Sequence, residues 1–295
     1  MRKTFEKRMG RLLVGLLFLF IVVVFGSFEN NSIVVSEYEV ASEYLPESFD
    51  QTVILHVSDL HNKLFGKKQE RLIKKVKQQK PDVIVVTGDL IDSNHPDVEA
   101  GLLFMEEAVK IAPVYFVTGN HDNWLSDTNT YRLFRGMEQL GVNVLVDESK
   151  KLTLGQGNEY ICLWGIDDDT QALKSKLREV LSQLSKESFG EETEKGKVAE
   201  RTFTLLLAHE PQLFPVYAEF DVDLVLSGHA HGGQFRIPFV GGLVAPDQGF
   251  LPVYTKGIYE DNQSRMIVSA GLGNSVVPQR LLNRPELVKI TLKHE

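Results

Sequence analysis

Cysteine is almost absent from this chain of 295 residues, since Cys162 is the only one. No disulfide can form within the chain and no thiolate cluster can hold a metal, and we read Cys162 as a small core residue. Positive charge is also scarce beyond the N-terminus: residues 29–295 carry 27 Lys and Arg against 39 Asp and Glu, a net charge of -12. A body this acidic is poorly suited to nucleic acid, because non-specific binding requires many cations against phosphates.

The first 28 residues have the opposite character, with five basic residues and one acidic residue. Charge is missing altogether from Leu12 to Phe28, which are apolar except for Gly15, Gly26 and Ser27. As a helix, this run would span roughly 26 Å, a little less than the ~30 Å hydrocarbon core of a bilayer. A buried helix of a soluble domain is disfavoured, because the run has no polar face and directly follows the basic cluster.

Two interpretations of this segment remain, an uncleaved membrane anchor and a cleaved signal peptide. No Ala-x-Ala cleavage site follows the run, and Val24-x-Gly26 is only a weak substitute. We therefore expect a single-pass anchor in the cell membrane. The positive-inside bias then places residues 1–11 in the cytoplasm and the acidic body outside. Cleavage would instead give a secreted or cell-wall protein.

Beyond the anchor, the sequence predicts strands that alternate with helices. Short apolar or β-branched runs end at polar clusters, at Thr52–Val57, Val83–Thr87, Val114–Thr118, Thr202–Leu207 and Leu224–Leu226. Apolar residues recur at helical spacing in Lys67–Gln79, Asp97–Ile111 and Thr130–Leu140. This alternation predicts an α/β architecture, and an apolar content of 43% suffices for a sizeable core.

Three parts follow from this pattern: residues 1–28 as basic N-terminus and anchor, 29–50 as a juxtamembrane segment, and 51–295 as one catalytic domain. The juxtamembrane segment contains an alternating stretch, Ile33–Val40, that is compatible with an edge strand. Neither an internal repeat nor a linker divides residues 51–295. The charged stretch 186–201 is expected to form a solvated loop.

Polar clusters follow five of the predicted strands. They are Asp59-x-His61, Gly88-Asp89, Gly119-Asn120-His121-Asp122, His209-Glu210 and Gly228-His229-x-His231. Ligand sites of open α/β sheets form at the carboxyl ends of strands, where such loops meet. A set of Asp, Asn and His without sulfur suits divalent Mn, Fe or Zn. One such histidine could be an ordinary core residue, but five at strand ends indicate a metal site.

These clusters resemble the motifs of the calcineurin-like metallophosphoesterase superfamily. The similarity is greatest to a bacterial branch associated with the membrane or cell wall. That branch shows a Gly-His-x-His-Gly-Gly-Gln block, here 228–234, and a Ser-x-Gly-Leu-Gly…Arg-Leu…Pro-Glu stretch, here 269–286. The resemblance implies a four-layer α/β/β/α sandwich with two divalent metal ions at its centre.

The resemblance also implies a role for each residue of the clusters. One metal would be held by Asp59, His61, Asp89 and His231, and the other by Asp89, Asn120, His209 and His229. The two oxygens of Asp89 would bridge the pair, which would activate the attacking water. His121 would protonate the leaving oxygen or stabilise the transition state, and Asp122 would orient it.

The expected function is that of a membrane-anchored phosphoesterase that hydrolyses a phosphate ester, phosphodiester or pyrophosphate bond. The substrate would be a phosphorylated small molecule or a lipid-linked compound of the envelope. A non-catalytic scaffold with the same fold is the alternative, but such a protein should have lost a ligand, and none is missing.

Several other residues stay open at this point. Arg280 and Arg284 could meet a substrate phosphate or be structural, and His56 is expected in the core. His95 is expected in a surface loop rather than at the mouth of the site. Phe235–Phe250 could rest on a bilayer, shape the substrate pocket or pack as an ordinary loop.

Overall fold

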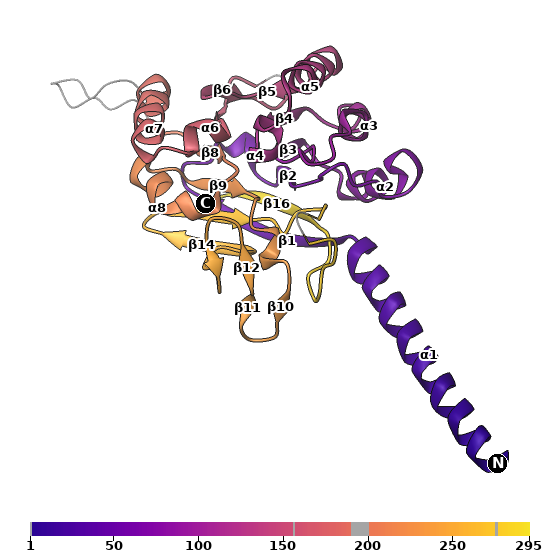
Figure 1. The fold of residues 1–295 in the computed structure, drawn as a ribbon. Coiled ribbons are helices and arrows are strands. Elements are labelled where there is room, and N and C mark those ends of the chain that lie inside the picture. The colour runs from indigo at the N-terminus through magenta and orange to yellow at the C-terminus, as the bar shows by residue number, and fades with distance from the viewer. Residues whose placement is uncertain (1, 156, 190–200, 275–276) are drawn as a thin grey trace, which may run out of the picture.

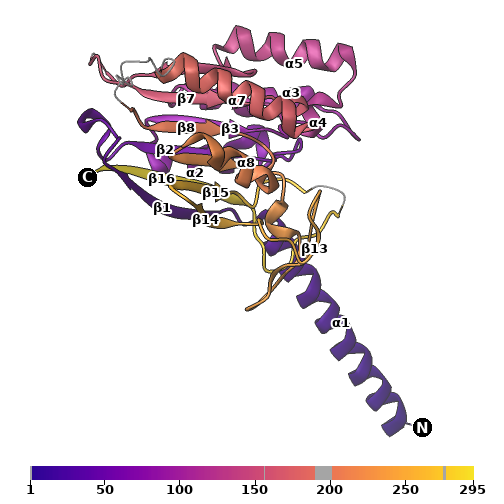
Figure 2. The same ribbon diagram turned by 90° about the vertical axis from the view of Figure 1, so that its left-hand side faces the viewer.

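The structure is a computed structural model that describes residues 2–155, 157–189, 201–274 and 277–295. Two six-stranded sheets pack face to face, and helices cover their outer faces (Figure 1). This arrangement confirms the predicted four-layer α/β/β/α sandwich. A single long helix, α1 (Arg2–Asn31), projects away from the sandwich (Figures 1 and 2).

The first sheet is largely parallel. It contains the three strands that the sequence predicts at Thr52–Val57, Val83–Thr87 and Val114–Thr118. Its order is β1 (Val34–Ser42), β16 (Glu286–His294), β2 (Val53–Val57), β3 (Val83–Thr87), β4 (Val114–Val117) and β5 (Asn143–Val144). Only the β16–β2 pairing is antiparallel.

The second sheet has the order β14 (Gly257–Asp261), β15 (Ser264–Val268), β9 (Leu224–Ser227), β8 (Thr204–Leu207), β7 (Ile161–Gly165) and β6 (Glu148–Leu152). Its four central strands are parallel and its two edge strands antiparallel. Two short hairpins lie outside both sheets, β10 (Arg236–Ile237) with β11 (Gly241–Gly242), and β12 (Val244–Ala245) with β13 (Gly249–Phe250).

The central strands are buried on both faces, which explains their continuous apolar sequences. In β3, Val83 and Val85 point between the sheets, whereas Ile84 and Val86 point toward the outer helices. The outer face of the first sheet packs against α2 (Glu70–Gln79), α3 (Val98–Ala108) and α5 (Asp127–Leu140). That of the second sheet packs against α7 (Lys174–Phe189) and α8 (Phe214–Tyr217). The two remaining helices are short, α4 (Asn120–Asn123) and α6 (Asp168–Gln171).

Two regions outside the central strands were less predictable. The alternating stretch 33–40 forms β1, which pairs in parallel with β16 at the edge of the first sheet. The charged stretch 186–201 does not begin as a loop, because α7 continues to Phe189, whose ring packs against Trp164. Residues 190–200 lie outside the described residues. The division of the chain at residues 28 and 50 stays a prediction.

Candidate metal centre

The five polar clusters meet at one edge of the sandwich, where strands of both sheets end. They follow β2, β3 and β4 in the first sheet and β8 and β9 in the second, always at the carboxyl end. None of the nine predicted site residues is more than 8% exposed: Asp59, His61, Asp89, Asn120, His121, Asp122, His209, His229 and His231. Parallel strands carry their carboxyl ends to one edge, which explains how residues far apart in the chain become neighbours.

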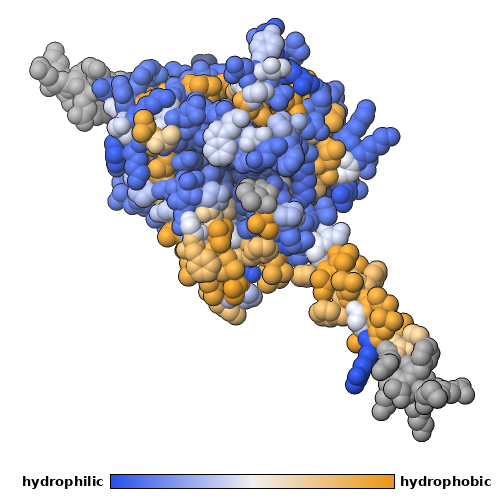
Figure 3. Space-filling model, in the orientation of Figure 1, coloured by the Kyte–Doolittle hydropathy of each residue, from blue (hydrophilic) through white to orange (hydrophobic). Residues whose placement is uncertain are grey.

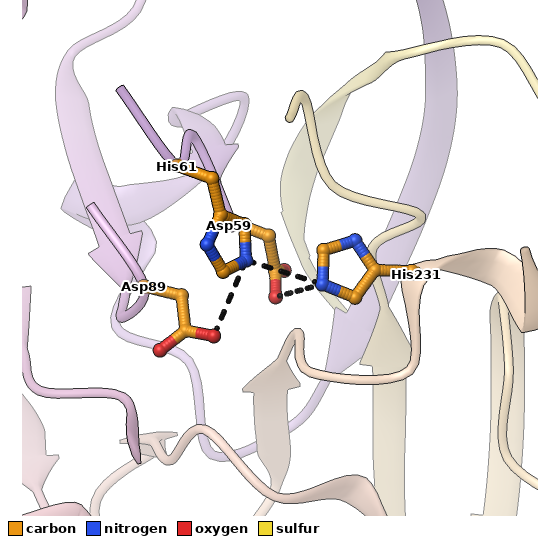
Figure 4. A group of neighbouring side chains, drawn as sticks. All are labelled: Asp59, His61, Asp89 and His231. Atoms are coloured by element: carbon orange, nitrogen blue, oxygen red, sulfur yellow. Dashed lines mark hydrogen bonds and ion pairs between the residues drawn. The ribbon is translucent and has the colours of Figure 1, made fainter. Parts of the chain in front are cut away.

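Four of these residues form a first group, drawn in Figure 4. The Nε2 atoms of His61 and His231 lie 3.2 Å apart. Asp89 Oδ2 is 3.3 Å from His61 Nε2, and Asp59 Oδ1 is 3.5 Å from His231 Nε2. Each of these residues thus turns a ligand atom toward one common point.

A second group consists of Asp89, His209 and His229. His229 Nδ1 lies 3.1 Å from His209 Nε2, which in turn is 3.5 Å from Asp89 Oδ2. The Nδ1–H of His209 donates to the carbonyl of Thr87 at 2.7 Å, which leaves Nε2 free to act as a ligand. The other ring nitrogen of His229, Nε2, is 2.8 Å from Asp247 Oδ2.

Asp89 belongs to both groups through a single oxygen. Oδ2 faces His61 and His209, whereas Oδ1 accepts the backbone N–H of His121 at 2.8 Å. Oδ1 keeps a second lone pair beside this hydrogen bond, so the expectation that both oxygens of Asp89 span the pair stays a prediction. Although burial opposes it, the surrounding histidines, His209 foremost, hold the pKa of Asp89 below its ordinary value.

The orphaned oxygen of Asn120 and the lowered pKa values of His61 and His231 also fit a bound metal pair. Asn120 Oδ1 is buried and has no hydrogen-bond partner within the part of the chain that the structure describes, as expected of an unfilled ligand. Burial lowers the pKa of His61, and burial together with His61 and Arg280 lowers that of His231. Both rings are therefore neutral at pH 7, the form in which imidazole binds metal.

The backbone of the site is strained in a way that places the ligands. Asp59, His61, Asp89, His229 and His231 all have positive φ, between 46° and 62°, a region that non-glycine residues rarely adopt. Such strain concentrates at functional sites, where the surrounding structure enforces it. Two glycines allow the close approach, since a Cβ on Gly119 would overlap Asp89 and one on Gly228 would overlap Ser58 and Asp59.

The structure changes the expected partner of His121. Asp122 is fully buried and accepts backbone N–H groups of Gly119 at 3.0 Å and Ile91 at 3.1 Å. Among the described residues, its carboxylate has no bond to His121, so the expectation that it orients this ring is wrong. Its role is to join the loops after β3 and β4. Burial and the charge of Asp89 raise the pKa of Asp122 to about 7.

The ring of His121 is held instead by the loop after Asp89. Its Nδ1 lies 3.1 Å from the backbone nitrogen of Ser93, 3.0 Å from Ser93 Oγ and 3.3 Å from Asp92 Oδ1. The Ser93 amide can only donate to Nδ1, whereas the Asp92 carboxylate can only accept from it, so these contacts fit a proton on Nε2 in the neutral ring and on both nitrogens in the imidazolium. Sequence reasoning missed Asp92, although its position three residues after Asp89 in one loop was a usable signal.

The remaining candidates have structural roles or lie outside the groups. Arg280 is fully buried and donates to the carbonyls of Ala270 and Gly273, so it is structural. Arg284 lies over the Phe28 ring, and His95 is on the surface, 3.5 Å from Asp92. Asp247, which sequence reasoning also missed, reaches His229 from the Phe235–Phe250 segment, where no local pattern singles it out.

Comparisons with known proteins identify a family. A family model described as calcineurin-like phosphoesterase matches residues 52–233. The chain is 31% identical over 273 residues to an uncharacterized metallophosphoesterase, YkuE, of Bacillus subtilis (strain 168), covering 90% of this chain and 87% of that protein. It is 30% identical over 269 residues to a "Transmembrane protein with metallophosphoesterase domain" of Danio rerio, covering 88% of this chain and 57% of the relative. A crystal structure of a Thermus thermophilus protein covers 75% of this chain and 90% of its own, with 12% identity and a TM-score of 0.47.

Proposed function

We propose that this protein uses two metal ions and works while anchored in a membrane. The premise is that the chain belongs to the calcineurin-like phosphoesterases and is a metal-dependent phosphoric ester hydrolase. The observation that carries the metal pair is the position of Asp89 Oδ2 between two groups of buried histidines. In this proposal, Asp59, His61, Asp89 and His231 hold one ion. Asp89, Asn120, His209 and His229 hold the other.

The chemistry divides between the metals and the chain. Two divalent ions, Mn, Fe or Zn by the donor set, would activate water and neutralise charge on the phosphoryl oxygens when bound. The chain supplies the ligands in fixed orientation, and it excludes bulk water because every one of them is buried. As an imidazolium, with its Nδ1–H directed at Asp92 Oδ1, His121 would donate the proton on its Nε2 to the leaving oxygen or to a phosphoryl oxygen and become neutral. Asp92 and Ser93 hold the ring in place for that transfer.

The anchor in this proposal is α1. Met9–Asn31 is long and apolar enough to cross a bilayer, and its apolar side chains are exposed along its length. The positive-inside bias then puts the basic N-terminus in the cytoplasm and the body outside. An anchored body and a net charge of -12 in residues 29–295 favour a phosphoester or pyrophosphate of an envelope or lipid-linked compound over a nucleic acid.

Activity can be tested with paired chromogenic substrates, one phosphate monoester and one diester. The full chain, purified in detergent, is stripped of metal and then supplied separately with Mn, Fe, Zn or Mg. We expect turnover that depends on the added metal and that saturates at two ions per chain. Saturation at one ion would contradict the paired site, and metal-independent turnover would contradict the metal mechanism.

Anchoring is tested separately, by cell fractionation. An uncleaved α1 keeps the protein in the membrane fraction through high-salt and alkaline washes, and added protease digests the body in cells without a wall. A soluble mature form that begins near Ser27 would show that the segment is a signal peptide.

A further inference from the structure

The two short hairpins carry a group of exposed apolar side chains. The exposed large apolar residues of the hairpins and the turn that follows them are Ile237, Phe239, Val240, Val244, Phe250, Leu251 and Val253, which we call the apolar tip. Phe239 is fully exposed, and Phe250 and Val253 are 71% and 69% exposed. In Figure 3 the apolar tip forms an orange surface at the lower edge of an otherwise mostly blue body. A contiguous apolar projection of this kind marks a surface that meets a partner or a membrane.

The apolar tip lies beside the end of α1. The segment 277–284 connects them: Gln279 Nε2 donates to the carbonyl of Gly26 at 3.1 Å, and the Arg236 amide donates to the carbonyl of Leu281 at 3.0 Å. Leu282 lines the same surface pocket as Phe239. Both ribbon views show the hairpins and α1 projecting from the same side of the sandwich (Figures 1 and 2).

Cations lie between the apolar tip and α1. A pocket of about 480 Å³ at this place is lined by Arg236, Lys256 and Arg284, with Glu29 as its one acidic residue. An apolar surface bordered by basic side chains is the pattern of segments that sit in the bilayer interface, where acyl chains meet charged headgroups. The rest of the body is acidic, so this basic border sets the tip apart.

We propose that the apolar tip inserts into the interface of the same bilayer that α1 crosses, so that the body rests on the membrane at two places. This inference rests on the proposed anchoring by α1. A helix alone would leave the body free to tilt, whereas two neighbouring points of insertion fix its orientation.

The orientation matters because both histidines of the Gly-His-x-His motif are tied to these membrane-side elements. Asp247, in the turn between β12 and β13, lies 2.8 Å from His229 Nε2. Asn283 donates its side chain to the carbonyl of His231 at 2.7 Å, and its backbone amide donates to Glu29 of α1 at 3.2 Å. Insertion of the apolar tip thus holds the metal centre close to the lipid headgroups, where a phosphoester of a lipid-linked compound lies.

Depth-dependent fluorescence quenching tests the proposal. Phe239→Trp and, as a second variant, Phe250→Trp place a reporter on the apolar tip. The matched control is Tyr131→Trp, because Tyr131 is 66% exposed on α5, on the far side of the sandwich (Figure 1). Each full chain is reconstituted in phosphatidylcholine–phosphatidylglycerol vesicles with or without brominated acyl chains. The signal of the native Trp124 and Trp164 is subtracted with the parent protein.

We expect brominated lipid to quench the tryptophan on the apolar tip several-fold more than the one at position 131, together with a blue shift of its emission. Equal, weak quenching at all three positions, in protein that resists alkaline extraction, would overturn the insertion and leave the anchor intact. Protein that alkali extracts would remove the anchor and this inference together. A blue shift that depends on protein concentration in lipid-free micelles, without quenching in vesicles, would assign the tip to contacts between copies and overturn the proposal.

Discussion

Proteins usually bury apolar side chains and expose polar ones, and two regions of this protein do the opposite, each in its own way: the metal-site loops and the apolar tip. The loops bury carboxylates and imidazoles among two sheets, whereas the tip exposes phenylalanine and valine. Each departure costs free energy in an isolated soluble body, through desolvation in one case and hydration of apolar surface in the other. Under the two proposals, each region would be completed by a partner, metal ions for the loops and a bilayer for the apolar tip.

The largest expected effect, on metal content and turnover, comes from Asp89→Ala in the metal-site loops. Because Asp89 Oδ2 faces both histidine groups, its loss should remove metal from both and abolish turnover. Asn120→Ala, the control, should weaken mainly the group that contains His209 and His229. Elemental analysis of the purified variants, with turnover, measures both effects. Full occupancy and normal turnover in Asp89→Ala would contradict the shared ligand.

Proton transfer gives the next largest effect. His121→Ala should keep both metals and lower kcat by about 10²–10⁴-fold, the usual loss for a general acid. The loss should shrink for leaving groups of low pKa, which depart without a proton. Asp92→Asn should give a smaller loss in the same direction, because it removes only the carboxylate beside Nδ1. Metal loss in His121→Ala, or an equal rate loss for good and poor leaving groups, would rule out acid catalysis.

A buried histidine outside the proposed ligand set tests how much the burial of an ionisable side chain costs in stability. His56 is fully buried in β2, and burial lowers its pKa to about 3. Below about pH 6.5 the unfolded chain gains a proton that the folded chain does not, so stability falls as the pH drops. Between about pH 6.5 and 4 the loss is roughly 3 kcal/mol. Denaturant unfolding of the parent and His56→Gln in detergent should differ in pH dependence by this amount, and parallel curves would contradict it.

The smallest effect concerns the apolar tip. Phe250→Ser should change the free energy of unfolding in detergent by no more than ~0.5 kcal/mol, because its ring is exposed and contributes little to the core. Phe116→Ala is the contrast, since Phe116 is fully buried in β4 and its loss should cost about 3–5 kcal/mol. Denaturant unfolding measures both. Destabilisation by Phe250→Ser comparable to that by Phe116→Ala would mean that the tip is packed rather than free.

Sequence reasoning reached the central strands and the clusters at their ends, but it was less successful with the contacts between clusters. Asp122 follows His121 directly in the chain, yet α4 turns its carboxylate away to the amides of Gly119 and Ile91. Asp92, from a different loop, lies beside the ring instead. Adjacent residues of a helix point in different directions, so adjacency along the chain was a poor guide to contact.

The sequence by itself determined the alternation of strands and helices, the apolar helix and the set of candidate ligands, because strand and helix periodicity and the residue types at strand ends are local properties. Only the tertiary structure decided that one oxygen of Asp89 faces both groups, that Asp92 lies beside His121 and that Asp247 returns from the β12–β13 turn to His229. Each of these contacts joins loops far apart in the chain. Their geometry depends on how two sheets pack, which no local pattern encodes.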